Sequence, residues 1–114
     1  MNANRRRGEI VAELDGRPFR LCLTLGALAE LEACYGAADL GELVERFSSG
    51  RLSATDLIRV VGAGLRGAGH SVEDEAVRTM QAEDGAAGFA RIVAELLTAT
   101  FGAGPKEGQQ PGPR

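Results

Sequence analysis

The sequence predicts an α+β fold, in which an N-terminal two-stranded β-hairpin precedes a compact bundle of about five α-helices. Two observations favour this class. Near the start of the chain, two runs of alternating apolar and polar residues flank an Asp-Gly pair, which is the pattern of a β-hairpin. After residue 24, apolar residues recur at helical spacing between capping residues and glycines. The 114 residues suffice for one domain with one modest core.

The hairpin is predicted to turn at Asp15 and Gly16, because both central residues of a type I′ turn need a positive φ. A two-residue loop puts Glu9 and Glu13 on one face and six apolar residues on the other. Those six residues are Ile10, Ala12, Leu14, Phe19, Leu21 and Leu23. Pro18 then lies opposite Glu13 at a position without ladder hydrogen bonds, so it is compatible with the hairpin and blocks further pairing at that edge.

Capping residues predict where the first three helices begin. These residues are Thr24, Asp39 and Ser53. The first helix is expected to end at Gly36, and the other two open with capping-box patterns, because an acidic residue follows each cap by three positions. Gly62 and Gly64 lie inside the third helix. Each costs about 1 kcal/mol relative to Ala, so we expect this pair to permit a close helix–helix approach.

The last two helices follow a Gly-rich break in the sequence. Ser71 is expected to cap the fourth helix, with the acidic residues 73–75 in its first turn, where the helix dipole favours negative charge. Gly85 marks the junction to the last helix, which is predicted over about 86–101 with a broad apolar face. That face consists of Phe89, Ile92, Val93, Leu96, Leu97 and Phe101.

Composition divides the chain into three predicted segments. They are a flexible basic leader (1–8), a single α+β domain (9–101) and a disordered Gly- and Pro-rich tail (102–114). The only dense basic run, Arg5, Arg6 and Arg7, lies in the leader. We interpret this run as a solvated segment, with a phosphate or nucleic-acid contact as the alternative.

Charge and hydropathy argue against two classes of partner. The net charge is −3 and the pI is near 5.2, so the chain lacks the basic surface of a general nucleic-acid or anionic-membrane binder. No apolar run approaches the roughly 18 residues that a membrane span needs. No apolar segment of the signal-peptide type follows the arginines, so we expect a cytoplasmic protein with no nucleic-acid and no membrane partner.

The sequence predicts no catalytic residue, no metal ligand and no cofactor site. His70 is the only histidine, and its Gly-rich surroundings indicate a solvated turn residue. The glycines of 62–67 lack the preceding strand of a dinucleotide-binding loop, and the acidic run 73–75 has no EF-hand spacing. Cys22 and Cys34 form no CxxC motif and are expected to be reduced, unreactive thiols. We therefore expect a protein that binds other proteins and is not an enzyme.

Several stretches of the chain resemble a family of tail-assembly chaperone-like proteins, which gene transfer agents and related tailed phages encode near the tape-measure gene. The stretches are 16–32, 39–43, 50–58, 62–67 and 88–97. Their residue types are common, but their order and spacing together are fairly specific. The resemblance covers roughly residues 8 to 101, which is nearly the whole predicted domain.

The resemblance implies a non-enzymatic role in which the protein binds the tape-measure protein before tube subunits polymerise around it. We expect the contact surface to lie on the last helix, with part of the first helix nearby. The expected partner-binding residues are Leu28, Leu31, Leu96, Leu97 and Phe101. Contact with other tail proteins and homo-oligomerisation stay open. The alternatives are a structural tail or connector component that stays in the particle, and a small nucleic-acid-associated regulator that uses the three arginines.

Overall fold

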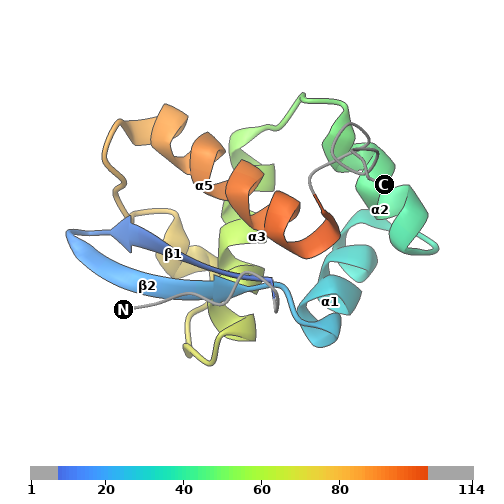
Figure 1. Cartoon of the computed structure of the whole chain (residues 1–114), viewed down its shortest axis with the longest axis horizontal. Helices are drawn as coiled ribbons and strands as arrows, with labels where there is room; N and C mark the ends of the chain where they lie inside the picture. Colours follow the sequence, from blue (N-terminus) through green and yellow to red (C-terminus); the bar gives the residue numbers. More distant parts are fainter. Residues whose placement is uncertain (1–7, 103–114) are drawn as a thin grey trace, which may run out of the picture.

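A computed structural model describes residues 8–102, and it confirms the predicted class, an antiparallel two-stranded hairpin followed by five helices (Figure 1). The elements are β1 (Glu9–Leu14), β2 (Arg17–Cys22), α1 (Leu25–Tyr35), α2 (Leu40–Ser48), α3 (Ala54–Gly67), α4 (Asp74–Val77) and α5 (Gly85–Phe101). Apart from Gly8 and Gly102, the predicted leader and tail lie outside the described residues. Their predicted flexibility stays a prediction.

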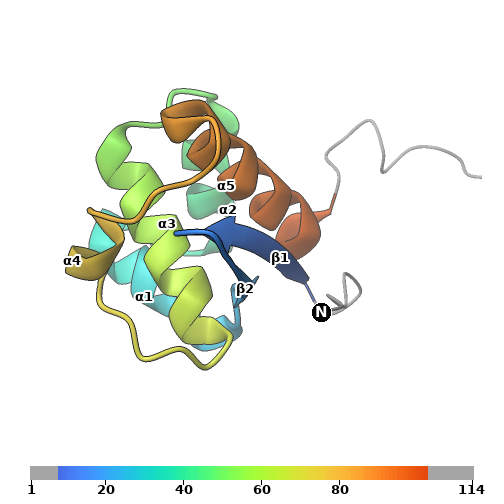
Figure 2. The same cartoon turned by 90° about the vertical axis from the view of Figure 1, so that its left-hand side faces the viewer.

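Helix α3 occupies the centre of the molecule. It contacts β2, α1, α4 and α5, while α5 also packs along β1 and α2 packs on α1. Figure 2 shows α3 between the short helix α4 on one side and the hairpin and α5 on the other. This arrangement lets one helix bury apolar side chains from most other elements, which explains why no second sheet is needed to close the core.

The hairpin has the predicted register. Asp15 and Gly16 have φ values of 54° and 76°, as a type I′ turn requires, and Glu13 pairs with Pro18. Of the six apolar residues predicted to share one face, Phe19 is half-buried and the other five are buried. The alternation of the sequence therefore determined which face of the hairpin meets the helices.

One hydrophobic cluster forms the core, and every described helix and strand contributes at least one buried residue to it. The largest fully buried side chains are Leu14, Leu21, Leu31, Leu43, Leu65, Leu96, Val60, Val61 and Val93. Burial of each such side chain stabilises the fold by about 1.5–3 kcal/mol. Aliphatic side chains fill the centre, as expected for a chain with only 4% aromatic residues.

Two glycines of α3 allow close packing. A Cβ on Gly64 would lie 2.8 Å from Cδ2 of Leu96 and 3.2 Å from Cδ2 of Leu21, so the hairpin and α5 both approach α3 at this point. The expected close helix approach is thus confirmed for Gly64. At Gly62, by contrast, the neighbour is the Asp74 carboxylate. A Cβ on Gly67 would collide with the backbone carbonyl of Cys22, which brings the end of α3 against the end of β2.

The first three predicted caps are present. Thr24 accepts a hydrogen bond from the Ala27 amide at 3.1 Å, and Asp39 accepts one from the Glu42 amide at 2.9 Å. Ser53 forms a complete capping box with Asp56. In α2 the box differs from the prediction. The Glu42 carboxylate accepts its bond from the amide of Ala38 and not from that of the cap.

The predicted start of the fourth helix at Ser71 is wrong. Helix α4 begins only at Asp74, has four residues, and its cap residue Glu73 makes no side-chain capping bond. Residues before it are held in another conformation, because the Val72 amide donates to the His70 carbonyl at 3.0 Å. The Val72 carbonyl in turn accepts from Arg66 at 2.8 Å. These contacts compete with a helical turn, and the arginine that makes one of them belongs to α3.

Candidate interaction surfaces

The predicted partner-binding residues divide into two groups. Leu28, Leu31 and Leu96 are at most 5% exposed, because α1 and α5 turn these side chains into the core around α3. Leu97 and Phe101 are half-buried and pack on the edge of the core. The structure therefore leaves Leu97 and Phe101 as the members that a partner can reach, and contact between them and a partner stays a prediction.

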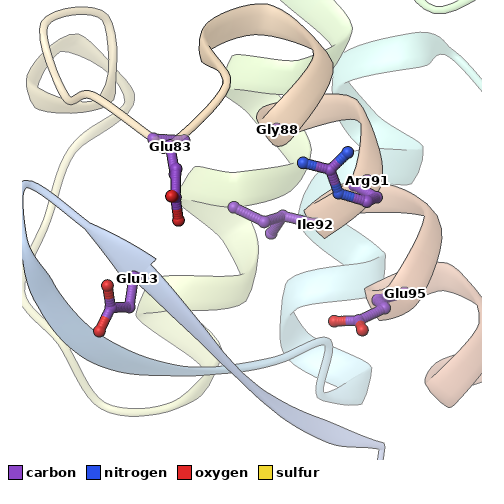
Figure 3. A pocket seen from close by; sticks show the side chains of 7 residues that line it. Glu13, Glu83, Gly88, Arg91, Ile92 and Glu95 are labelled. Atoms are coloured by element: carbon purple, nitrogen blue, oxygen red, sulfur yellow. The ribbon is translucent and has the colours of Figure 1, made fainter.

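A groove lies between β1 and the N-terminal half of α5 (Figure 3). We call it the β1–α5 groove; its lining residues are Glu13, Ala82, Glu83, Gly88, Arg91, Ile92 and Glu95. In Figure 3, Glu13 and Glu83 lie on opposite sides of the opening, and the side chain of Ile92 points between them. The groove thus has an apolar floor and acidic walls. Sequence periodicity missed it, because its walls come from segments about 70 residues apart.

The one cation in this lining has a partner outside the groove. Arg91 forms an ion pair with Asp84 at 2.7 Å. Both side chains are well exposed, so this pair contributes little to stability. The Asp84 carboxylate nevertheless offsets the positive charge of Arg91. The other charged residues of the lining are Glu13, Glu83 and Glu95, which all carry carboxylates.

The hairpin tip fixes one wall of the groove. The Asp15 amide donates to the Gln81 carbonyl at 2.8 Å, and the Gln81 amide donates back to the Asp15 carboxylate at 2.8 Å. A Cβ on Gly88 would collide with the carbonyl of Glu83, so the loop before α5 lies directly on that helix. These contacts hold the loop that carries Glu83. The acidic lining also continues round the tip to Asp15.

A second surface feature is an apolar hollow between α3, α4 and α5. We call it the α3–α5 hollow; its lining residues are Ala54, Leu57, Ile58, Val77, Arg78, Met80, Ala86 and Phe89. Leu57, Ile58, Met80 and Phe89 are half-buried, so each presents apolar surface to the solvent. A single apolar side chain of another protein fits the chemistry of this lining.

A buried network joins three helices around Asp56, whose exposure is 4%. Tyr35 donates a hydrogen bond to Oδ1 of Asp56 at 2.6 Å, and the Ser53 amide donates to Oδ2 at 2.8 Å. The guanidinium of Arg46 lies 3.5 Å from Oδ1 and 4.2 Å from the Tyr35 ring centroid, and that of Arg59 lies 5.1 Å from the same centroid. The network holds the ends of α1, α2 and α3 together.

The electrostatics of this network favour a neutral phenol beside a charged carboxylate. Burial by itself would raise the pKa of Asp56, but hydrogen bonds from Tyr35 and Ser53 and the charge of Arg46 together lower it. Burial and the hydrogen bond to Asp56 raise the pKa of Tyr35 to about 12. Both shifts follow from holding the pair together, so this network is best explained as structural. The sequence indicated only the capping role of Asp56.

A second network surrounds Arg66 of α3. Its guanidinium lies 2.9 Å from a carboxylate oxygen of Glu30 and 3.0 Å from one of Asp74. These hydrogen bonds raise the pKa of Arg66 against the effect of its burial. Arg66 therefore links α1 and the start of α4 to α3. The carboxylates of Glu30 and Asp74 offset its positive charge.

His70 and the two cysteines lie in three different environments. His70 is half-buried and not solvated as expected, because its ring packs edge-to-face on Phe19 with the centroids 5.4 Å apart. Burial and the nearby Glu9 carboxylate raise the pKa of the Cys22 thiol, which disfavours the reactive thiolate. Cys34 is an exposed free thiol.

Residues 8–102 contain neither a metal-binding cluster nor a helix fit to span a membrane. The side chains there include no cluster of histidine, cysteine and carboxylate groups suited to hold a metal ion. None of the helices within 8–102 combines the length and apolar character that a bilayer crossing requires.

The architecture is that of a small α+β protein whose distinctive surfaces are a groove and a hollow. The family model described as phage tail tube protein, GTA-gp10, matches residues 7–103, and the chain belongs to this family. This match confirms the expected relation to the tails of gene transfer agents and phages. Its description names a tube protein, a structural part, and not a chaperone. No curated protein and no solved structure matches the chain.

Proposed function

We propose that this protein is a non-enzymatic structural component of the tail of a gene transfer agent or a related phage-like particle, and that it stays in the finished tail. The observation that carries this proposal is the match to the tail tube family, which spans all described residues. A tail component is synthesised inside the bacterial cell, so the expected cytoplasmic location applies to the stage before assembly.

The placement of apolar side chains supports a structural role over a chaperone role. A chaperone that holds an apolar helix needs an accessible apolar groove. The face that was expected to provide this groove is largely buried, because Leu28, Leu31 and Leu96 pack inside the protein's own core. Only Leu25 and Leu40 are large apolar residues with exposed side chains among residues 8–102. Large apolar side chains are therefore scarce on the surface of the described residues.

The test is the protein content of purified particles. A structural component is expected in purified tails at a fixed stoichiometry that survives a high-salt wash and a density gradient. Its amount per particle, measured by quantitative mass spectrometry against a known capsid protein, is the deciding quantity. Absence from purified tails, together with presence in the producing cells, would contradict the proposal.

A tail-assembly chaperone is the second candidate, and the α3–α5 hollow is the observation that favours it. The hollow offers Leu57, Ile58 and Phe89 to an apolar side chain of a client such as the tape-measure protein. Co-expression with tape-measure fragments tests this candidate. A chaperone keeps the fragments soluble and co-purifies with them, and the variant Ile58→Glu loses both effects, whereas Leu25→Glu, a change at an exposed position outside the hollow, keeps them.

A further inference from the structure

The β1 strand has a free edge that faces the β1–α5 groove. In a hairpin with a two-residue loop, alternate residues direct their backbone groups away from the partner strand. The register Leu14–Arg17 and Glu13–Pro18 makes Glu9, Val11 and Glu13 the residues of β1 whose backbone groups point outward. The amide and carbonyl groups of Val11 and Glu13 have no hydrogen-bond partner among residues 8–102. An extended segment can therefore add to this edge.

The opposite edge of the hairpin cannot be used in the same way. Pro18, the second residue of β2, lacks the N–H that an added strand would need, so pairing beside β2 is interrupted next to the turn. The β1 edge, by contrast, has α5 as a second wall, with Ile92 on the floor of the groove between them (Figure 3). A strand edge beside a helix is an established mode of peptide recognition, because main-chain bonds and side-chain contacts then act together.

Charge decides which segment fits. The groove and the hairpin tip present Glu13, Glu83 and Asp15, and Arg91 is paired with Asp84. An acidic segment is repelled there, whereas a basic segment is attracted by each carboxylate. In the sequence, the densest basic run is Arg5, Arg6 and Arg7, directly before β1.

The position of Gly8 argues that this basic run serves a neighbouring copy. A Cβ on Gly8 would lie 3.5 Å from the carbonyl oxygen of Ala99, so the chain enters β1 beside the last turns of α5. Glu13 lies at the other end of β1, beside the first turns of α5. To reach its own groove, the segment would have to reverse direction immediately before β1. A segment from a second copy enters without that reversal.

We propose that residues 5–7 of one copy bind as an added strand along β1 of the next copy, inside the β1–α5 groove. The contact is heterologous, since one copy gives its basic segment and the other gives its groove. Contacts of this type repeat from copy to copy and build rings or open helical arrays. The inference deepens the proposed structural role and rests on it, because a tail tube needs such a repeating contact.

Complementary charge reversals test the proposal. The segment variant carries Arg5→Glu, Arg6→Glu and Arg7→Glu; the groove variant carries Glu13→Arg and Glu83→Arg, both exposed in the structure. Sedimentation velocity in reducing buffer, over a range of protein and salt concentrations, measures association. Arg51→Glu, at an exposed position outside the groove, is the control, and circular dichroism verifies that each variant folds.

We expect the wild type and Arg51→Glu to associate, more weakly as salt rises. Each reversal variant alone is expected to associate about tenfold or more weakly, and an equimolar mixture of the two is expected to associate again, because each segment then meets a groove of opposite charge. A wild type that stays monomeric, or a segment variant that associates unchanged, overturns the inference. A mixture that stays monomeric indicates that the segment binds its own chain and also overturns it. The proposed structural role is judged separately, by the presence of the protein in purified tails.

Discussion

The hydroxyl of Tyr35 donates a 2.6 Å hydrogen bond to the buried carboxylate of Asp56 and thereby joins the end of α1 to the start of α3. The two residues are 21 positions apart, and each also has a local role: Asp56 completes a capping box, and Tyr35 is the last residue before the Gly36 helix stop. One bond thus makes two helix ends depend on each other. The relationship leads to the first two predictions.

Removal of the Tyr35 hydroxyl is expected to destabilise the protein. Tyr35→Phe keeps the ring against Phe47, whose centroid lies 5.5 Å away, but leaves a buried carboxylate oxygen without its shortest hydrogen bond. We expect the free energy of unfolding to fall by about 1–3 kcal/mol, because a charged acceptor loses a donor. Urea unfolding followed by circular dichroism measures the change. An unaltered midpoint would mean that Arg46 or water replaces the hydroxyl at no cost.

The ionisation of Tyr35 is expected to be displaced to alkaline pH. The phenol has a pKa of about 12 in the folded protein, whereas about 10 is normal in an unfolded chain. Because the folded value is the higher one, the associated stability is present below pH 10 and is lost as the pH rises from about 10 to 12. The sequence has a single tyrosine, so the ultraviolet absorbance of tyrosinate reports this group alone. A midpoint near 10 in the folded protein would contradict the Asp56 contact, and titration in urea is the control.

A methyl group at Gly67 is expected to disrupt the junction of α3 with β2. In Gly67→Ala the new Cβ collides with the backbone carbonyl of Cys22, which cannot rotate away as a side chain would. We expect a loss of about 1–3 kcal/mol, typical of overpacking. Gly26→Ala is the matched control, because the nearest atom to its Cβ, Oγ1 of Thr24, is 3.8 Å away and alanine is the better helix former. Equal melting temperatures for the two variants would contradict the close approach.

Neighbouring leucines of α5 are expected to respond differently to truncation. Leu96 is fully buried, so Leu96→Ala should cost about 2–5 kcal/mol. Leu97 is half-buried, and Leu97→Ala is expected to cost clearly less because only part of its surface leaves the core. Denaturant unfolding of both variants checks the order. A reversed order would show that α5 is rotated relative to the structure, and that Leu97 is not available to a partner.

Local sequence patterns predicted the elements that depend on residues close together in the chain. The Asp15–Gly16 turn, the pairing of Glu13 with Pro18, and the caps at Thr24 and Ser53 all involve residues within a few positions of one another. Such interactions recur in any fold that contains the same segment, so a single sequence reveals them. The same patterns correctly predicted an α+β class with a hairpin and five helices.

Predictions that depended on distant residues were less successful. Ser71 carries a good capping side chain, yet the preceding turn is held by Arg66 and the helix begins three residues later. His70 lies in a Gly-rich segment, yet its ring packs in a T-shaped contact with the ring of Phe19 in the hairpin. In both cases the deciding contact comes from another element. Local propensity contributes only tenths of a kcal/mol per residue, so one such contact outweighs it.

The sequence by itself determined the hairpin register, most helix ends and the apolar face of each helix, because these follow from backbone geometry and from periodicity along one segment. Only the tertiary structure decided how those faces are used. The glycines of α3 let the hairpin and α5 come so close that Leu96 is fully buried, which leaves Leu97 and Phe101 at the edge. The same packing opens a groove between β1 and α5, where Glu13 and Glu83 lie on opposite sides of the opening. The placement of these two carboxylates at one groove depends on how the elements pack. The periodicity of a single segment contains no information about that packing.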